Sequence, residues 1–340
     1  MAKDGAASAA LTPADYHTAE AFDRERRTLF ARAWTPVCRA SALVPGAQRA
    51  AMVGAQPVLV TRDLGGALHA LSNVCRHRGM TLVEGEAHAD VVRCPYHLWT
   101  YGLDGALQAA PFMQGVDLGG CDLPRYRAAE WGGWVFVNLD RGAPSLETEL
   151  APLCEALDPD RIAGLEVGFT LTFEHAWNWK VMLENFGESY HHIGTHAGTL
   201  QPLWPGGQTD SSVSTDRWLE IRHPEHPSAG TLRVFVVFPL LLLALTPSDG
   251  AVIWYRMTPT GPERIALEVV GLYPPALASD AERMQSARAS VFAVHQEDMA
   301  VCERVQAGLR APDAVLGPLS PLEAGIARFR EWVGREVART

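Results

Sequence analysis

The chain has 340 residues, of which 47% are hydrophobic and 20% are charged. This length predicts about two domains with a sizeable buried core, and the apolar fraction excludes an intrinsically disordered chain. The formal net charge of −10 argues against a protein that binds duplex nucleic acid, because phosphate backbones require a basic surface.

The first predicted element is a helix over residues 12–34, which we expect to pack on the second domain. Thr12 can cap this helix, and Pro13 suits its first position. Before it, residues 1–8 lack the basic and then apolar segments of a signal peptide. We therefore expect a cytoplasmic protein.

Residues 35–140 alternate short apolar runs with Gly, Pro and Asp turns, which is typical of an all-β domain. The segment from Asp140 to Ser145 has the composition of a linker. We therefore divide the chain into an N-terminal helix over 1–34, a β domain over 35–145 and a second domain over 146–340.

The second domain mixes strands and helices, so the predicted fold class is α+β. Three apolar segments are predicted as strands of one antiparallel sheet: Val234–Leu245, Ala251–Met257 and Ile265–Tyr273. The first of them can form one or two buried strands, and it is shorter than the ~20 residues that span a bilayer. Residues 280–309 are predicted to form a long helix after Ser279.

Two Cys-His pairs in the β domain form a candidate metal site. They are Cys75-Arg-His77 and Cys94-Pro-Tyr-His97, with 16 residues between His77 and Cys94. Four such ligands can hold a tetrahedral zinc ion, although zinc motifs usually separate the members of a pair by at least two residues. The alternation of cysteine and histidine suits a two-iron cluster better, with both cysteines on one iron and both histidines on the other. Six cysteines in all are too sparse for a disulfide framework.

This pattern resembles the Rieske [2Fe–2S] motif. The resemblance assigns Cys75, His77, Cys94 and His97 as the cluster ligands. Leu98 stands where many Rieske loops have glycine, so we expect the second loop to form without a positive φ at this position.

A second cluster of metal-binding residues lies in the segment Asn178–His196, which holds three histidines and two glutamates. On a regular helix, His192 and His196 would share a face because they are four residues apart. His191 and His196 could converge only if the helix breaks between them, and Gly194 is placed to allow this.

The segment resembles the mononuclear iron motif of Rieske non-haem oxygenases. The resemblance maps the motif onto Asn185, Glu188, His191 and His196, so it selects His191 over His192 as a ligand. It also implies catalytic roles for Glu188 and Asn185.

A third ligand is needed, because non-haem iron oxygenases use two histidines and one carboxylate. Asp298 falls on an apolar stripe of the helix over 280–309, where a lone carboxylate is costly unless it is paired or binds a metal. That stripe comprises Met284, Ala287, Val291, Val294, Val301 and Val305. Glu297 falls on the polar face and is expected to be solvated. Asp298 is the predicted ligand, and the alternative is a buried aspartate that pairs with an arginine or caps a bend.

The resemblance to Rieske non-haem iron oxygenases (ring-hydroxylating alpha subunits) covers nearly the whole chain. It implies an antiparallel β Rieske domain followed by a helix-grip catalytic domain. The implied cofactors are a [2Fe–2S] cluster and a mononuclear Fe(II). The chain has no Gly-rich dinucleotide fingerprint, so electrons from NADH or NADPH would come through a separate flavin or iron–sulfur reductase.

The family also implies a head-to-tail homotrimer, in which Glu188 bridges its own His191 and His97 of the partner subunit. Most ring-hydroxylating members have aspartate at the position of Glu188. Glutamate resembles the subgroup that acts on quaternary ammonium compounds, such as carnitine and glycine betaine. We therefore predict oxidation of a quaternary or N-methylated amine with O2, with loss of the methyl group as formaldehyde.

Two alternatives remain. One is hydroxylation of an aromatic ring or aromatic acid, and the other is a Rieske electron carrier or redox sensor without oxygenase activity. No membrane or nucleic-acid partner is expected. Candidate residues of the substrate pocket are aromatic: Trp204, Trp218, Phe235, Phe238 and Trp254. The histidines outside the two motifs are read as structural or surface residues: His17, His69, His88, His175, His223, His226 and His295.

Overall fold

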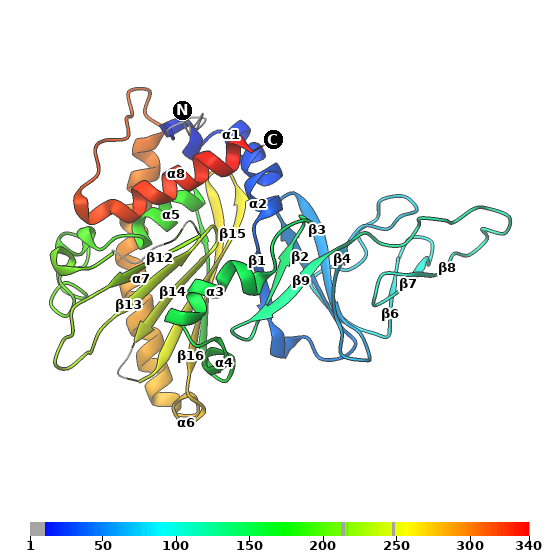
Figure 1. The fold of residues 1–340 in the computed structure, drawn as a ribbon, viewed down its shortest axis with the longest axis horizontal. Helices are drawn as coiled ribbons and strands as arrows, with labels where there is room; N and C mark the ends of the chain where they lie inside the picture. The colour runs from blue at the N-terminus through cyan, green and yellow to red at the C-terminus, as the bar shows by residue number, and fades with distance from the viewer. Residues whose placement is uncertain (1–10, 212–214, 216, 247–248, 340) are drawn as a thin grey trace, which may run out of the picture. The chain divides into compact units, whose positions relative to one another are not determined.

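The computed structural model describes residues 11–211, 215, 217–246 and 249–339 (Figure 1). Its contacts divide the chain into a unit over Phe30–Ala163, here the β unit, and a sheet–helix unit that contains residues up to Leu29 and from Gly164 onward. The second boundary therefore lies after Ala163, and not after residue 145. The reason is that α3 (Leu146–Ala156) docks on the β unit, where Trp131 Nε1 donates to Cys154 Sγ at 3.2 Å. Helix α4 (Pro159–Ala163) follows it.

The β unit contains an antiparallel seven-stranded sheet in the order β1-β10-β9-β4-β3-β2-β5 and a three-stranded sheet, β6-β7-β8. The strands of the larger sheet are β1 (Thr35–Arg39), β2 (Ala47–Val53), β3 (Gln56–Arg62), β4 (Leu68–Ser72), β5 (Glu86–His88), β9 (Arg125–Trp131) and β10 (Trp134–Asn138). Those of the smaller are β6 (Val91–Arg93), β7 (Thr100–Gly102) and β8 (Leu107–Ala109). A single 3-10 turn, η2 (Ala40–Ala42), interrupts the strands of residues 35–140 as the structure describes them.

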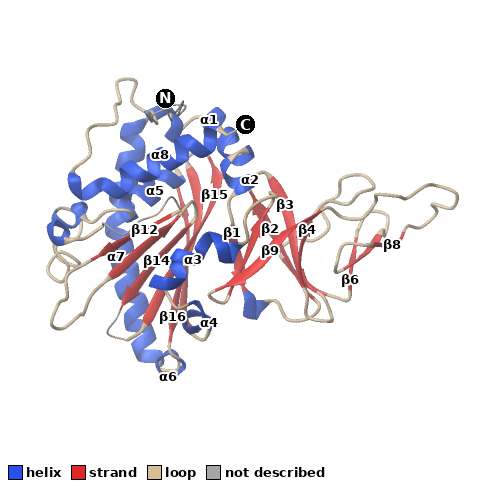
Figure 2. Cartoon of the chain, viewed as in Figure 1, coloured by secondary structure: helices blue, strands red, loops and turns tan. Residues whose placement is uncertain are grey.

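The sheet–helix unit contains one antiparallel six-stranded sheet in the order β11-β16-β15-β14-β13-β12. Its strands are β11 (Glu166–His175), β12 (Trp218–Arg222), β13 (Arg233–Val237), β14 (Leu241–Thr246), β15 (Ala251–Gly261) and β16 (Arg264–Tyr273). Four helices follow β11 in the described chain: α5 (Trp179–Phe186), α6 (Pro275–Ala278), α7 (Ala281–Leu309) and α8 (Ala324–Ala338). Three 3-10 turns lie among them: η3 (Tyr190–Ile193), η4 (Gly206–Gln208) and η5 (Pro321–Glu323). Helix α7 packs on β11 and α5, and Figure 2 shows it running along the sheet.

The predicted strands and the long helix are all present. The run Val234–Leu245 becomes two strands, β13 and β14, which separate at Pro239, because proline has no N–H for the ladder. Helix α7 begins at Ala281, and Asp280 rather than Ser279 caps it by accepting from the N–H of Arg283.

The single helix predicted over 12–34 is wrong. The chain forms a 3-10 turn η1 (Pro13–Tyr16), then α1 (Ala19–Arg27) and α2 (Leu29–Arg32). The Thr12 N–H donates to the Asp15 carboxylate at 2.8 Å, so Thr12 begins only the short turn. Thr18 is extended, with ψ of 145°, and its side chain caps α1, which prevents one continuous helix.

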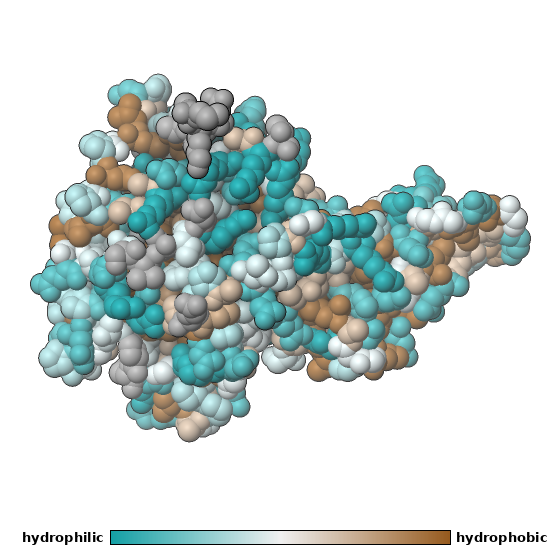
Figure 3. Space-filling view, in the orientation of Figure 1, coloured by the Kyte–Doolittle hydropathy of each residue, from teal (hydrophilic) through white to brown (hydrophobic). Residues whose placement is uncertain are grey.

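Helix α8 is amphipathic. It buries Ile326, Phe329, Trp332 and Val333, and Figure 3 shows mainly hydrophilic surface where the helix is exposed. None of the described helices has the length and apolarity needed to cross a membrane.

A buried ion pair fixes α1 on α5. Lys180 Nζ lies 2.5 Å from Glu25 Oε1, and the two residues are 0% and 2% exposed. Trp179 Nε1 donates to the other Glu25 oxygen at 2.8 Å. The Lys180 ammonium also lies 5.1 Å from the ring centres of Tyr16 and Trp179. Each of the two buried charges is compensated by the other, so the loss of one would leave the other buried and unpaired.

We predict that Glu25→Gln lowers the free energy of unfolding by about 3–5 kcal/mol, because it leaves the Lys180 charge buried and unpaired. Urea denaturation followed by tryptophan fluorescence measures this loss. Arg24→Gln on the same helix is the control, since its ion pair with Asp15 is exposed and should contribute less than about 1 kcal/mol. Equal losses in the two variants would contradict the prediction.

Candidate metal sites and substrate cavity

The four residues of the predicted two-iron site lie on two loops of the β unit. Cys75 and His77 follow β4, and Cys94 and His97 lie between β6 and β7. The Cys75 N–H donates to the Met80 carbonyl at 2.8 Å, so the first loop closes on its cysteine. The rings of His77 and His97 lie 4.7 Å apart.

These side chains fit a Rieske cluster. Cys75 and Cys94 are 3% and 1% exposed, and both are free thiols. Burial, and to a lesser degree the neighbouring Cys75 thiol, raise the pKa of Cys94. The Nδ1 atom of His77 is buried and has no hydrogen-bond partner in the part of the chain that the structure describes. A buried nitrogen left unpaired beside two thiols is what a metal ligand would be, because such an atom is otherwise costly.

The cluster loops rest on packed side chains of the β unit. The ring of Trp99 stacks on His77 with centroids 4.9 Å apart. Tyr101 places its hydroxyl 3.3 Å from Cys75 Sγ and accepts from the Arg76 N–H at 3.1 Å. Tyr101 is 0% exposed. The loops are therefore held before any cluster binds.

The expectation for Leu98 is wrong. Its φ is +61°, although it has a side chain. The Leu98 N–H donates to the Cys94 carbonyl at 3.0 Å, which closes the second loop and requires the left-handed conformation at this point. A left-handed non-glycine residue costs about 1–2 kcal/mol. The loop therefore keeps the geometry of its glycine counterparts at an energetic cost.

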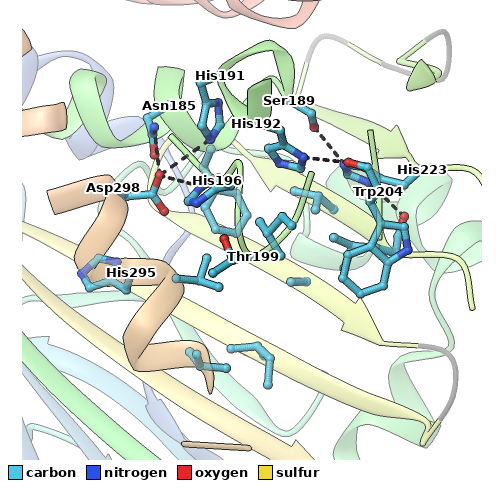
Figure 4. A pocket seen from close by; sticks show the side chains of 18 of the residues that line it. Asn185, Ser189, His191, His192, His196, Thr199, Trp204, His223, His295 and Asp298 are labelled. Carbon is cyan, nitrogen blue, oxygen red and sulfur yellow. Dashed lines mark hydrogen bonds and ion pairs between the residues drawn. The ribbon is translucent and has the colours of Figure 1, made fainter. Parts of the chain in front are cut away.

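His191, His196 and Asp298 converge in the sheet–helix unit (Figure 4). One ligand atom of each lies within 4.8 Å of the others. Asp298 Oδ1 is 3.1 Å from His196 Nε2 and 3.6 Å from His191 Nε2. Two imidazoles and one carboxylate at these separations can hold one metal ion on a single face.

A break in the helix brings the two histidines together. Helix α5 ends at Phe186, and His191 lies in the separate 3-10 turn η3. Gly194 ends that turn, as predicted, with φ of −106°, which is not left-handed. The regular i, i+4 spacing that favoured His192 therefore does not apply here.

The Nδ1 atom of His192 faces a backbone carbonyl and not the group that can hold a metal. Its Nδ1 lies 2.9 Å from the Trp204 carbonyl oxygen, and its ring is 4% exposed. Burial lowers the pKa of His192 to about 3. Among the described residues, the ion-binding group contains His191 and not His192.

Glu188 and Asn185 hold two members of the triad. Glu188 Oε1 is 2.6 Å from Nδ1 of His191, and its other oxygen accepts the backbone N–H of His191 at 3.1 Å. Asn185 Nδ2 donates to Asp298 Oδ1 at 3.3 Å. A carboxylate that accepts from Nδ1 fixes the ring and leaves Nε2 free to bind a metal.

Glu297, expected to be solvated, does the same for His196. Its Oε2 is 2.7 Å from His196 Nδ1 and accepts the Thr199 hydroxyl at 2.6 Å. Burial lowers the pKa of His196, but the contacts with Asp298 and Glu297 outweigh burial and raise it above its usual value. Sequence spacing could not reveal this role, because His196 lies 101 residues earlier in the chain.

The buried face of α7 differs in detail from the predicted stripe. Of the predicted stripe, Met284 is buried but Val305 is 45% exposed, and three residues outside the stripe are buried: His295, Cys302 and Gln306. Gln306 can be buried although it is polar, because its side-chain oxygen accepts the N–H of Asn178 at 2.8 Å. Asp298, the predicted third ligand, is half-buried on the same helix.

A cavity of about 540 Å³ includes the triad in its lining. Of the five aromatic candidates for this pocket, Trp204 lines it. Trp218, Phe235, Phe238 and Trp254 are instead buried in the core, as aromatic residues at strand positions usually are. The structure adds Phe186 and Tyr255, whose ring centres are 4.9 Å apart.

Two histidines without a motif also line the cavity. His223 Nε2 lies 2.9 Å from the Ser189 hydroxyl, and its ring stacks on His192 with centroids 5.4 Å apart. His295 Nε2 lies 2.9 Å from Nε2 of His175. No local sequence signal marks His223, because its partners come from other segments.

Residues 33–126 match the Rieske [2Fe-2S] domain family, and residues 162–228 and 211–339 match the ring hydroxylating alpha subunit (catalytic domain) family. The chain belongs to the ring-hydroxylating alpha-subunit family. The predicted fold class and the resemblance drawn from the Cys-His and His-His motifs are therefore confirmed. A Rieske domain joined to this catalytic domain implies a [2Fe–2S] cluster and a mononuclear iron, as predicted.

Several relatives share this organisation. The chain is 34% identical to the glycine betaine monooxygenase oxygenase subunit of Pseudomonas aeruginosa (strain UCBPP-PA14), over 56% of this chain and 48% of the relative. It is 29% identical to the carnitine monooxygenase oxygenase subunit of Escherichia coli K12, over 88% of this chain and 84% of the relative. The chain spans about half the length of the first curated relatives it matches.

Solved structures give the same fold. The quaternary ammonium Rieske monooxygenase CntA with L-carnitine superimposes with a TM-score of 0.82 at 25% identity, over 96% of this chain and 95% of that chain. Naphthalene 1,2-dioxygenase from Rhodococcus with indole gives 0.76 at 22% identity, over 96% and 94%. The second likeness concerns the fold alone.

We predict that Glu297→Gln weakens metal binding at the triad by about 10- to 100-fold, because the amide no longer fixes the tautomer of His196. Anaerobic titration with Fe(II) or Co(II) measures the affinity. Glu303→Gln, an exposed position on the same helix, is the matched control and should bind metal like the unmodified protein. An unchanged affinity in Glu297→Gln would show that this contact does not support the site.

Proposed function

We propose that this chain is the oxygenase component of a Rieske system that uses O2 and reductase-supplied electrons to oxidise an N-methylated amine. The observation that carries the proposal is the convergence of His191, His196 and Asp298 in the wall of a cavity of about 540 Å³. Two histidines and one carboxylate leave positions of a metal open for O2 and substrate. An electron carrier would not need such a cavity.

The residues divide into ligands and positioning groups. His191, His196 and Asp298 are assigned to the mononuclear iron, and Cys75, His77, Cys94 and His97 to the cluster. When bound, the cluster supplies single electrons and the iron supplies the activation of O2. Glu188 keeps the His191 ring oriented, and Asn185 does so for the Asp298 carboxylate.

The reaction on the substrate is an oxidation of the N-methyl carbon. One C–H bond becomes C–OH with an oxygen atom from O2, and the other atom leaves as water after the addition of two electrons and two protons. The resulting N–CH2OH group breaks at its C–N bond and releases formaldehyde and the demethylated amine. The chain contributes a cavity with a mainly apolar lining, which includes side chains such as Phe186 and Trp204.

Relatives and residues support this substrate class over others. The relatives named above are a glycine betaine monooxygenase and a carnitine monooxygenase subunit. Glu188 stands at the position that the quaternary-ammonium subgroup fills with glutamate. Phe186, Trp204 and Tyr255 supply aromatic faces, which attract ammonium groups.

The partners follow from the same proposal. A separate flavin or iron–sulfur reductase would deliver electrons from NADH or NADPH, which favours a cytoplasmic location. We further propose a homotrimer, in which Glu188 links His191 to His97 of the partner subunit. Each Glu188 oxygen accepts one hydrogen bond from His191 and keeps a lone pair for a second donor.

Hydroxylation of an aromatic ring or aromatic acid is the second candidate, favoured by the aliphatic side chains of the cavity such as Leu203 and Val234. A single-turnover experiment separates the two. Chemically reduced protein meets isotopically heavy O2 and a panel of N-methyl amines and aromatic acids, and products are read by mass spectrometry. Formaldehyde that carries one heavy oxygen is the expected result. A label retained on a ring would establish the second candidate instead.

We predict that His191→Ala and Asp298→Ala each lose the mononuclear iron but keep the cluster, because the two sites share no ligand. Iron content per chain and the visible absorption of the cluster measure the two sites separately. His192→Ala is the control and should keep both. If His192→Ala empties the iron site while His191→Ala does not, the ligand assignment is wrong.

A further inference from the structure

Five polar side chains that line the cavity direct hydrogen-bond donors into the protein. Each hydroxyl or amide of five lining residues donates to a protein acceptor: Asn185 to Asp298, Ser189 to His223, Thr199 to Glu297, Thr246 to Asp249 and Ser290 to Ser286. These five donors are therefore already paired and are not offered to a ligand.

The tautomer of His223 settles the direction of one of these bonds. Its Nδ1 lies 3.1 Å from the carbonyl oxygen of Leu232, which can only accept, so Nδ1 carries the proton. His223 is 2% exposed and neutral, so its Nε2 is a lone-pair acceptor. The Ser189 hydroxyl at 2.9 Å must then donate to it.

The same argument makes His192 an acceptor that faces the cavity. Its Nδ1 must donate to the Trp204 carbonyl at 2.9 Å, so Nε2 of the neutral, buried ring presents a lone pair. No described residue donates to this Nε2, and His192 lines the cavity (Figure 4). An acceptor in such a place is costly to leave unpaired, so a ligand that brings a donor is favoured.

The acceptor lies next to the triad. The ring centre of His192 is 5.2 Å from that of His191 and 5.4 Å from that of His196. A donor held at Nε2 therefore belongs to the reacting end of the substrate, and not to a remote part of it. On an N-methylamine, the group that fits is the N–H of the nitrogen that carries the methyl group.

We propose that the cavity selects a protonated secondary or tertiary N-methylamine, whose N–H donates to Nε2 of His192 and whose methyl group faces the triad. The inference rests on the function proposed above and narrows its substrate class. A quaternary ammonium has no N–H and leaves His192 unpaired. A carboxylate on the substrate is also disfavoured, because no lysine or arginine is among the described residues that line the cavity.

Anaerobic calorimetric titration of the full-length holoprotein tests this with three probes of equal charge. N,N-dimethylbenzylamine and N-ethyl-N-methylbenzylamine carry an N–H when protonated, whereas benzyltrimethylammonium does not. The ethyl compound has as many heavy atoms as the quaternary salt, so it controls for size. We expect both amines to bind about 10- to 100-fold more tightly, which is the value of a hydrogen bond to a charged donor.

The variant His192→Asn keeps an N–H for the Trp204 carbonyl and removes the acceptor at Nε2. It should weaken binding of the two amines by the same factor and leave the quaternary salt unchanged. His88→Asn, an exposed position in the β unit, is the control and should change neither. If His192→Asn fails to fold, the comparison of the three probes on the unmodified protein still decides the question.

The outcomes separate this inference from the function on which it rests. Equal or tighter binding of the quaternary salt, no binding of any probe, or an equal loss for all three in His192→Asn would overturn the inference. Release of formaldehyde from the quaternary salt would overturn it and leave the proposed oxygenase function standing. Amine binding that depends on His192 without formaldehyde in single turnover would overturn N-demethylation, and not the hydrogen bond.

Discussion

The hydrogen bond between a carboxylate and the Nδ1 of each triad histidine is the constraint on which the rest of the site depends. Glu188 holds His191 at 2.6 Å and Glu297 holds His196 at 2.7 Å. Each bond places a proton on Nδ1 and leaves Nε2, which lies on the side of Asp298, as the atom that can bind a metal. Without them the rings could turn and their tautomers could exchange, and three side chains from two distant segments would not share one ion.

The packing of α7 against α5 positions the residues of the triad and their carboxylate partners. Adjacent residues on α7 point about 100° apart, so Asp298 can face the ion while Glu297 faces the outer side of His196. Gln306 ties α7 to the start of α5, because it accepts the Asn178 N–H at 2.8 Å. The buried pair of Lys180 and Glu25 then fixes α5 against α1. Polar contacts in the core thus locate the elements that carry the triad.

The sequence predicts features that depend on neighbouring residues, and it fails for features that depend on contacts between distant segments. The spacing of Cys75, His77, Cys94 and His97 identified the cluster loops, and the strands and the long helix followed from their apolar patterns. The helix over 12–34 was wrong because Thr18 competes for the backbone of its neighbours. Glu297 was misread because a helical wheel describes one element, whereas its partner comes from another.

Leu98 is a second residue whose conformation a local sequence rule predicts wrongly. A propensity rule assigns positive φ to glycine, yet the loop closure between Cys94 and Leu98 imposes φ of +61° on leucine. Local preference is worth about 1–2 kcal/mol here, which the fixed ends of a metal-binding loop can outweigh. Site residues held by tertiary contacts are therefore where sequence rules fail first.

The neighbouring histidines 191 and 192 show how one short turn yields two chemical roles. In a 3-10 turn successive side chains point about 120° apart, so the two rings cannot face the same ion. Their planes are 87° apart, and one meets a carboxylate while the other meets a backbone carbonyl. Both partners accept a hydrogen bond from the Nδ1–H group and leave Nε2 as the acceptor. In His191 that lone pair is turned to a metal site, and in His192 it is turned to the cavity where a substrate donor can reach it.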